Sequence, residues 1–160
     1  MLLPATAAAK GPSEAKVTGP GLSSPLTISG NGESDTSTDL GLLVSETGFF
    51  PQAFGQSPSS MLQAIPQALG PRYLVTYTVP GSSTDLLVQD LYPYATGGPV
   101  SYMAPGQKFW GNQSTPGGWY RGTQGTRLKG MLVKAGLPAT APPAHDLAAA
   151  AASALLRHRR

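Results

Sequence analysis

Residues 72–92, RYLVTYTVPGSSTDLLVQDLY, decide the fold class of this 160-residue chain. Large apolar residues alternate with smaller ones through Tyr73–Val79, which is the two-residue period of a β-strand. The turn sequence GSSTD follows, and residues 86–92 supply an antiparallel partner strand. Residues 97–103, GGPVSYM, predict a third strand with Pro99 at its start, where a missing backbone N–H is tolerated. The segment therefore predicts the centre of an antiparallel sheet.

Elements upstream extend this sheet and begin to cover it. Two short strands are predicted at residues 15–18 and 26–29, joined by a Gly/Pro turn. A helix is expected to begin after Ser37 or Thr38 as its N-cap and to end with Gly48 at the C′ position. Residues 49–58 are expected to form an apolar, turn-rich link.

Two further helices are predicted on either side of the strand cluster. Residues 58–65 resemble a short helix with Pro58 in its first position, broken at Pro66. The sequence TRLKGMLVKAGLP has apolar residues at helical spacing, Thr126 as N-cap candidate and Gly136 as the stop signal. Together these patterns predict an α+β domain: a small antiparallel β-sheet with two or three short helices packed on one face.

The two ends do not carry the pattern of the domain, which is expected to span residues 15–138. Residues 1–14 are either a disordered N-terminus or a signal-peptide remnant, because ATAAA offers the small residues of a signal-peptidase site. Residues 139–160 are predicted as an Ala/Pro linker and a basic, Ala-rich helical tail, too short to span a bilayer but able to touch a membrane surface weakly. The signal-peptide interpretation favours a secreted or extracytoplasmic protein, and the alternative location is the cytoplasm.

Several chemistries have no support in the composition. The chain has no cysteine, and its two histidines, His145 and His158, lie in the tail. A Ser-His-Asp triad, a His- or Cys-bound metal and a phosphate-binding loop are therefore not expected in the domain, and no cofactor is predicted. The net charge is +3, but the basic residues are scattered, so nucleic-acid binding is not expected either.

Acidic residues give two weaker signals. Glu33, Asp35 and Asp39 could offer oxygen ligands to Ca²⁺, but the spacing is not that of an EF-hand, and a solvated loop explains them better. Asp90 is unusual inside a predicted strand. A structural role beside Arg72 or Arg121 is favoured, and the alternative is a small hydrolase that uses Asp90 with a Tyr helper or with Arg121.

Aromatic residues are concentrated between positions 90 and 120, which hold seven of the twelve in the chain. Tyr92 and Tyr102 lie in predicted strands and are expected to pack under the last helix, whose start Trp119 would cover. The rings predicted to lie in loops have less reason to be buried. They form the candidate contact surface together with two neighbouring basic residues: Tyr94, Phe109, Trp110, Lys108 and Arg121.

The order of the segments DLYPYA, GGPVSYM, PGQ and GGWYRG, followed by a helix that ends in GLP, resembles small exported or membrane-associated proteins of actinobacteria. The resemblance covers residues 16–138 and implies an extracytoplasmic location without implying an activity. The sequence therefore predicts a monomeric, non-enzymatic binding or accessory module for a protein or a cell-envelope component. The alternative is the Asp90 hydrolase.

Overall fold

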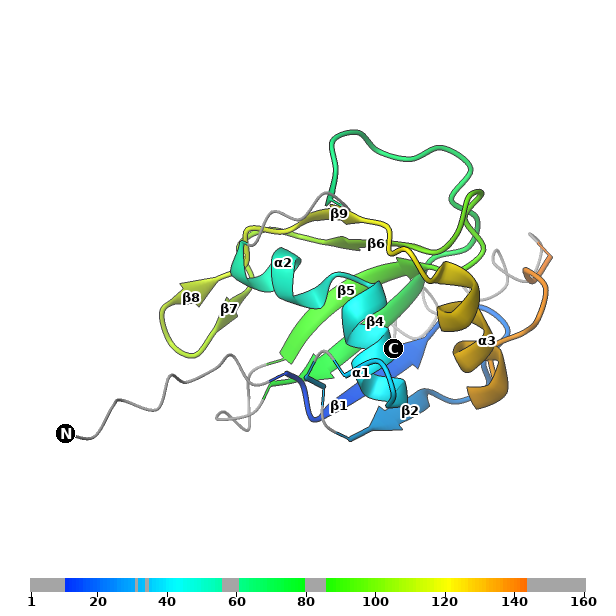
Figure 1. Ribbon diagram of the computed structural model, residues 1–160, viewed down its shortest axis with the longest axis horizontal. Coiled ribbons are helices and arrows are strands. Elements are labelled where there is room, and N and C mark those ends of the chain that lie inside the picture. The colour runs from blue at the N-terminus through cyan, green and yellow to red at the C-terminus, as the bar shows by residue number, and fades with distance from the viewer. Residues whose placement is uncertain (1–10, 31, 34, 56–60, 80–85, 144–160) are drawn as a thin grey trace, which may run out of the picture.

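The computed structural model of the chain describes residues 11–30, 32–33, 35–55, 61–79 and 86–143. Its centre is a seven-stranded sheet in the order β2-β1-β4-β5-β6-β9-β3, in which all neighbours are antiparallel (Figure 1). The strands are β1 (Glu14–Thr18), β2 (Leu26–Ser29), β3 (Met61–Leu62), β4 (Tyr73–Thr78), β5 (Leu86–Tyr92), β6 (Val100–Met103) and β9 (Gly118–Tyr120). A separate two-stranded hairpin is formed by β7 (Lys108–Phe109) and β8 (Gln113–Ser114).

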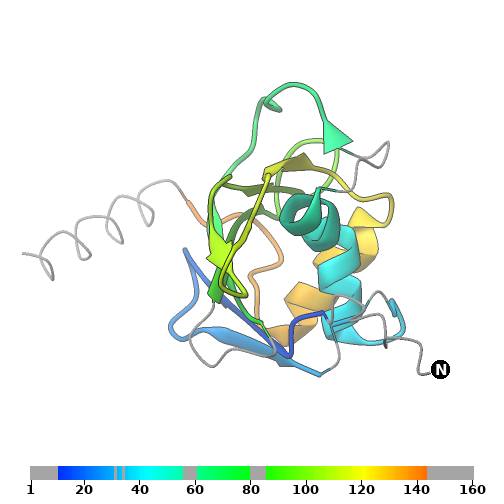
Figure 2. The same ribbon diagram turned by 90° about the vertical axis from the view of Figure 1, so that its left-hand side faces the viewer.

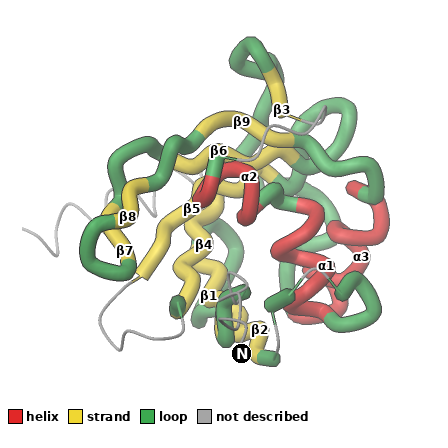
Figure 3. The backbone as a smooth tube through the Cα atoms, turned by 60° about the vertical axis from the view of Figure 1, so that its left-hand side comes forward, coloured by secondary structure: helices red, strands yellow, loops and turns green. Residues whose placement is uncertain are grey.

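The three helices in the described part of the chain lie together against one face of the sheet, as Figures 2 and 3 show from two directions. They are α1 (Asp39–Glu46), α2 (Phe49–Phe54) and α3 (Gly125–Ala135). The predicted α+β class, an antiparallel sheet with short helices on one face, is confirmed.

The two-residue period of β4 decides which side chains meet the helices. Tyr73, Val75 and Tyr77 are fully buried, whereas the intervening Leu74 is 39% exposed. Successive side chains on a strand point to opposite faces, so the odd-numbered positions of β4 build the core and the even-numbered ones face away from the helices.

Helix α1 begins and ends where the sequence predicts. The Thr38 hydroxyl accepts a hydrogen bond from the backbone N–H of Gly41 at 3.1 Å, as an N-cap does. Gly48 follows the helix in the left-handed conformation, with φ of 67°. A Cβ atom at Gly48 would overlap the ring of Tyr120, so this glycine is required both by its dihedral angle and by the close approach of β9.

Two local predictions are wrong. Residues 61–62 are not helical but form β3, which pairs with Tyr120 and Trp119 of β9; residues 56–60 lie outside the described part of the chain. Helix α2 forms where a link was expected. Its Pro51 stands in the first turn, where a missing N–H costs no helical hydrogen bond, and Phe49 anchors the helix in the core.

Helix α3 begins earlier than its sequence suggests. Gln124, not Thr126, is the N-cap residue, and its backbone N–H donates to Oε2 of the buried Glu46 at 2.8 Å. A carboxylate from α1 thus meets the start of α3, and no sequence pattern within α3 itself indicates this. The predicted end at Gly136 is confirmed, and Leu128 and Leu132 fix the helix to the core.

A buried polar network joins the helices to the sheet. Gln89 Nε2 donates to Gln52 Oε1 at 2.6 Å and to the Thr47 carbonyl at 3.0 Å, while the Tyr77 hydroxyl donates to Gln89 Oε1 at 2.8 Å. Gln52 Nε2 in turn donates to Ser101 Oγ at 3.1 Å. Buried polar groups stabilise a core only when they are paired, so these residues are occupied in structural contacts.

The predictions made for the two ends fall mainly on residues 1–10 and 144–160, outside the described part of the chain. This includes both histidines and the basic tail. Among the described residues, no helix combines the length and apolar character needed to cross a membrane.

Candidate functional site

The face of the sheet that the helices leave uncovered carries an unusual row of side chains. The strand register places Leu74 opposite Asp90, Asp90 opposite Tyr102, and Tyr102 opposite Trp119. Leu62 of β3 follows on the other side of Trp119. Directly opposed residues on neighbouring strands point to the same face, so these five side chains form one line across β4, β5, β6, β9 and β3.

Three rings pack against one another in and beside this row. The Trp119 ring centroid lies 4.6 Å from that of Tyr102 and 5.9 Å from that of Tyr92, with interplanar angles of 35° and 28°. All three residues are partly exposed. The prediction that Tyr92 and Tyr102 pack under a helix is wrong, because the register turns the buried Ser101 of β6 toward the helices and Tyr102 away from them.

The polar atoms of these rings have no hydrogen-bond partner among the described residues. Within the described part of the chain, the Tyr92 and Tyr102 hydroxyls and the Trp119 indole N–H make no hydrogen bond to another residue. The aromatic trio, Tyr92, Tyr102 and Trp119, therefore presents apolar surface together with two hydroxyls and one N–H donor. Tyr and Trp at binding surfaces combine these same two properties.

Asp90 lies beside the trio and is loosely paired with Arg72. Asp90 Oδ2 is 3.9 Å from Arg72 Nη1, and the two side chains are 22% and 67% exposed. Burial raises the pKa of the Asp90 carboxyl, an effect that the nearby Arg72 guanidinium partly offsets. Burial and the neighbouring Asp90 charge also raise the pKa of Tyr92. No described residue donates a hydrogen bond to the Asp90 carboxylate.

Arg121, the other predicted helper of Asp90, has a different position. Its Nη2 donates to the backbone carbonyl of Thr96 at 2.8 Å, and its Nε is buried without a partner among the described residues. The guanidinium lies against Gly97 in the connection between β5 and β6. Arg121 thus positions a loop, and of the two arginines considered, Arg72 is the one paired with Asp90.

Two of the predicted loop rings, Phe109 and Trp110, lie together at the β7–β8 hairpin, with ring centroids 5.3 Å apart. Phe109 is 1% exposed and packs edge-on against Phe54 with a centroid separation of 5.4 Å, so the expectation that it is a surface ring is wrong. The hairpin folds back on α2 and thereby buries this ring. Trp110 is 37% exposed over the same Phe54, and Lys108 is exposed beside it.

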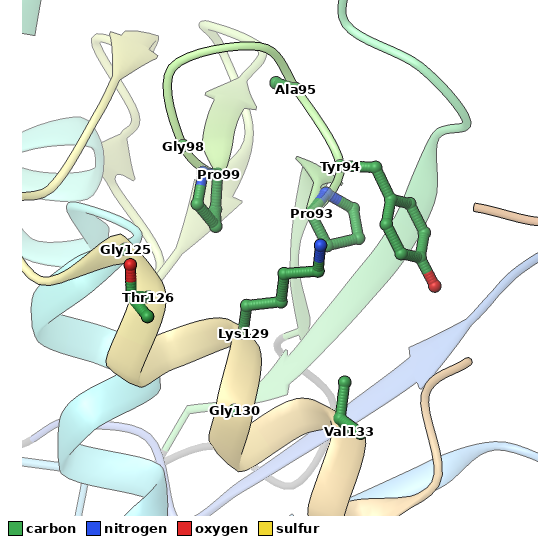
Figure 4. A pocket seen from close by; sticks show the side chains of 10 residues that line it. All are labelled: Pro93, Tyr94, Ala95, Gly98, Pro99, Gly125, Thr126, Lys129, Gly130 and Val133. Atoms are coloured by element: carbon green, nitrogen blue, oxygen red, sulfur yellow. The ribbon is translucent and has the colours of Figure 1, made fainter. Parts of the chain in front are cut away.

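Tyr94 belongs to a pocket of roughly 500 Å³ between α3 and the β5–β6 connection, shown in Figure 4. Its hydroxyl donates to the Pro138 carbonyl at 2.6 Å, and the Nζ atom of Lys129 lies 5.0 Å from its ring centroid. Tyr94, Phe109 and Trp110 therefore do not form one contiguous surface. Sequence reasoning found Tyr94 but missed the helical side of the pocket, whose residues 126, 129, 130 and 133 follow the spacing of one helix face.

The acidic loop before α1 has its own internal partners. Asp35 Oδ1 accepts hydrogen bonds from the Ser37 N–H at 3.0 Å and from the Ser37 hydroxyl at 2.6 Å. These bonds lower the pKa of Asp35. Within the described residues, no group of three or more His, Cys, Asp or Glu side chains is arranged to hold a metal ion.

No known protein family, curated protein or solved structure matches this chain. The geometry of the uncovered sheet face and of the pocket is therefore the basis for assigning a function.

Proposed function

We propose that the chain is a non-enzymatic binding module that recognises a neutral glycan on the uncovered face of its sheet. The observation that carries the proposal is the juxtaposition of the aromatic trio with the Asp90–Arg72 pair on the face of the sheet opposite α1, α2 and α3. The trio contributes partly exposed rings, and the pair contributes a carboxylate and a guanidinium that form no hydrogen bond with another described residue.

The chemistry of this surface suits sugars. The C–H faces of a pyranose pack on Tyr and Trp rings, while its neighbouring hydroxyls form bidentate hydrogen bonds with carboxylate and guanidinium groups. Asp90 and Arg72 neutralise each other, which favours an uncharged ligand over an ionic one. The charged Asp90–Arg72 pair lies beside the rings, whereas the core of a permanent protein interface is depleted of charged residues.

The hydrolase alternative is less well supported. Most glycoside hydrolases require two carboxylates across the scissile bond. The cross-strand neighbours of Asp90 are Leu74 and Tyr102, neither of which is a carboxylate. The raised pKa of Asp90 is explained by its burial, and the residue is assigned a hydrogen-bonding role toward the ligand.

The two tryptophans of the chain allow a direct test. In Trp110→Phe the remaining indole is Trp119 on the sheet face, and in Trp119→Phe it is Trp110 on the hairpin. We expect titration with neutral oligosaccharides, such as cellotetraose, chitotetraose and xylotetraose, to change the fluorescence of Trp110→Phe with at least one of them. The signal of Trp119→Phe should stay constant.

Trp119→Ala should weaken binding of that sugar at least tenfold, measured by calorimetry, and Trp110→Ala should leave the affinity within twofold. Circular dichroism confirms that both variants fold. If binding depends on Trp110 instead, the binding site lies at the β7–β8 hairpin and not on the sheet face. Binding of a proline-rich peptide without binding of any oligosaccharide would contradict the glycan assignment.

A glycan ligand agrees with the expected extracytoplasmic location, which remains a prediction. Fusion of residues 1–14 and the native upstream sequence to a reporter tests it, with export as the expected result. A reporter retained in the cytoplasm would argue for the cytoplasmic alternative.

A further inference from the structure

We propose that the pocket between α3 and the β5–β6 connection is a second ligand site, which takes a small organic anion. The carboxylate or phosphate of this anion would pair with Lys129, and the apolar or aromatic part of the anion would lie against Tyr94 and Pro99. The inference goes beyond the glycan proposal, because none of these residues belongs to the uncovered sheet face.

The charge of the pocket favours an anion. Lys129 is the one charged side chain among its lining residues, and it has no ion-pair partner among the described residues. Figure 4 shows its ammonium directed across the pocket from α3 toward Pro93 and Tyr94. Among the described residues it contacts the Tyr94 ring, an interaction that does not use its three N–H donors for hydrogen bonds. Thr126, three residues earlier on the same helix face, adds a hydroxyl.

The walls suit an apolar body of limited size. Pro93 and Pro99 are buried at both ends of the connection, and Arg121 fixes its middle through the Thr96 carbonyl. Tyr94 is held at its hydroxyl by Pro138. Pockets of 300–1,000 Å³ with apolar walls and few polar groups are typical of small-molecule sites, and roughly 500 Å³ lies in this range.

Gly130 is a second feature of α3 that favours a ligand site in this pocket. It stands in the interior of α3, where glycine disfavours a helix, yet a Cβ atom there would meet nothing within 4 Å. Packing therefore does not explain it. Gly125 in the same pocket differs, because a Cβ there would lie 2.8 Å from Pro99 Cδ. The absence of a side chain at Gly130 keeps the pocket open, as a ligand site requires.

Binding of three probes of similar shape tests the charge assignment. Benzoate and phenyl phosphate carry the two anionic groups, and benzamide is the neutral control. We expect at least one anion to bind, with amide chemical-shift changes at residues 93–99 and 125–133, and benzamide to bind at least tenfold more weakly. The better anion identifies a carboxylate or a phosphate site. Equal binding of benzamide, or no binding of either anion at millimolar concentration, would overturn the proposal.

Two variants separate a ligand role from a structural one. Lys129→Met should weaken anion binding at least tenfold, whereas Lys134→Met, an exposed lysine of the same helix, should leave it within twofold. Gly130→Leu should fill the pocket and abolish binding while keeping or raising the Tm, because leucine is the better helix former. Unchanged binding in Lys129→Met or in Gly130→Leu would refute the site. Trp119→Ala should retain anion binding, so failure of the glycan proposal would be recognised separately.

Discussion

The side-chain amide of Gln107 pairs with both backbone groups of Val88: its Nε2 donates to the Val88 carbonyl at 2.7 Å, and its Oε1 accepts from the Val88 N–H at 2.8 Å. Strand β6 pairs with β5 along Asp90, Leu91 and Tyr92, so Val88 lies beyond its end. One glutamine thus pairs with the backbone of β5 where β6 has ended.

Replacing this glutamine should destabilise the fold. Gln107→Ala leaves both Val88 groups unpaired, and we expect it to lower the free energy of unfolding by about 1–3 kcal/mol. Gln107→Glu should also lose stability at neutral pH, since a carboxylate cannot donate to the carbonyl. Urea unfolding measures both effects. Gln113→Ala, an exposed glutamine in β8, is the control and should change little; equal stability of the Gln107 variants would show that water replaces the amide fully.

The buried network should be sensitive to removal of its central amide. Gln89→Leu leaves Gln52 Oε1 without its donor and removes the Gln89 acceptor of the Tyr77 hydroxyl, which keeps only its contact with Thr47 Oγ1. The Thr47 carbonyl loses one of its two donors and keeps the Ser101 hydroxyl. We expect a loss of about 2–4 kcal/mol, because several buried polar groups lose partners at once. Chemical denaturation followed by circular dichroism measures it. A stability equal to that of the native chain would mean that the network repacks around leucine.

The close contact between Gly48 and Tyr120 gives a matched pair of glycine substitutions. Gly48→Ala must adopt a φ of 67° and displace the Tyr120 ring, whereas Gly106→Ala must adopt a φ of 85° with nothing within 4 Å of its Cβ. We expect about 1 kcal/mol of destabilisation at Gly106 from the backbone alone, and clearly more at Gly48. Similar thermal denaturation midpoints for the two variants would contradict a packing role of Gly48.

The pKa of Asp90 predicts a pH effect of defined sign. Because burial raises its folded-state pKa above the unfolded value, the folded protein binds more protons near the ordinary aspartate range of about pH 4. The stabilising contribution of the Asp90 carboxyl is therefore fully present below its unfolded-state pKa. It is lost as the pH rises through the higher folded-state pKa. The Asp90→Asn variant should not show this loss. The difference in unfolding free energy between the variant and the native chain should therefore favour the variant more at pH 7 than at pH 3.

Asp35 provides the opposite control for this measurement. The Ser37 hydrogen bonds lower its pKa, so its contribution is present at neutral pH and lost as the pH falls. Asp35→Asn should therefore lose relative stability at pH 7. Urea midpoints measured from pH 3 to pH 7 compare the two variants, and effects of the same sign would show that one assignment is wrong.

Local patterns were sufficient to predict the strands and caps that depend on neighbouring residues, such as the alternation in β4 and the N-cap at Thr38. Predictions that depended on distant partners were the ones that proved wrong. Residues 61–62 became a strand because β9 offers them an edge, and Phe109 became buried because its hairpin folds onto Phe54. The start of α3 is set by Glu46, 78 positions away.

The candidate sites were predictable only in part for the same reason. Asp90 and Tyr94 were identified from their own positions in the sequence. Whether Tyr102 faces the helices or solvent depends on the register between β5 and β6, which no local pattern in GGPVSYM specifies. Asp90 is paired with Arg72, and the Tyr94 ring is in contact with Lys129. Both partners come from other segments of the chain.

Alternate positions of the central strands point to opposite faces of the sheet, so one set builds the core and the other does not. Gln89 and Leu91 point toward the helices, whereas Asp90 and Tyr92, which alternate with them along β5, point to the opposite face and are partly exposed. Selection, or a combinatorial library, could therefore vary the outward positions and acquire new ligands while the inward positions keep the same scaffold.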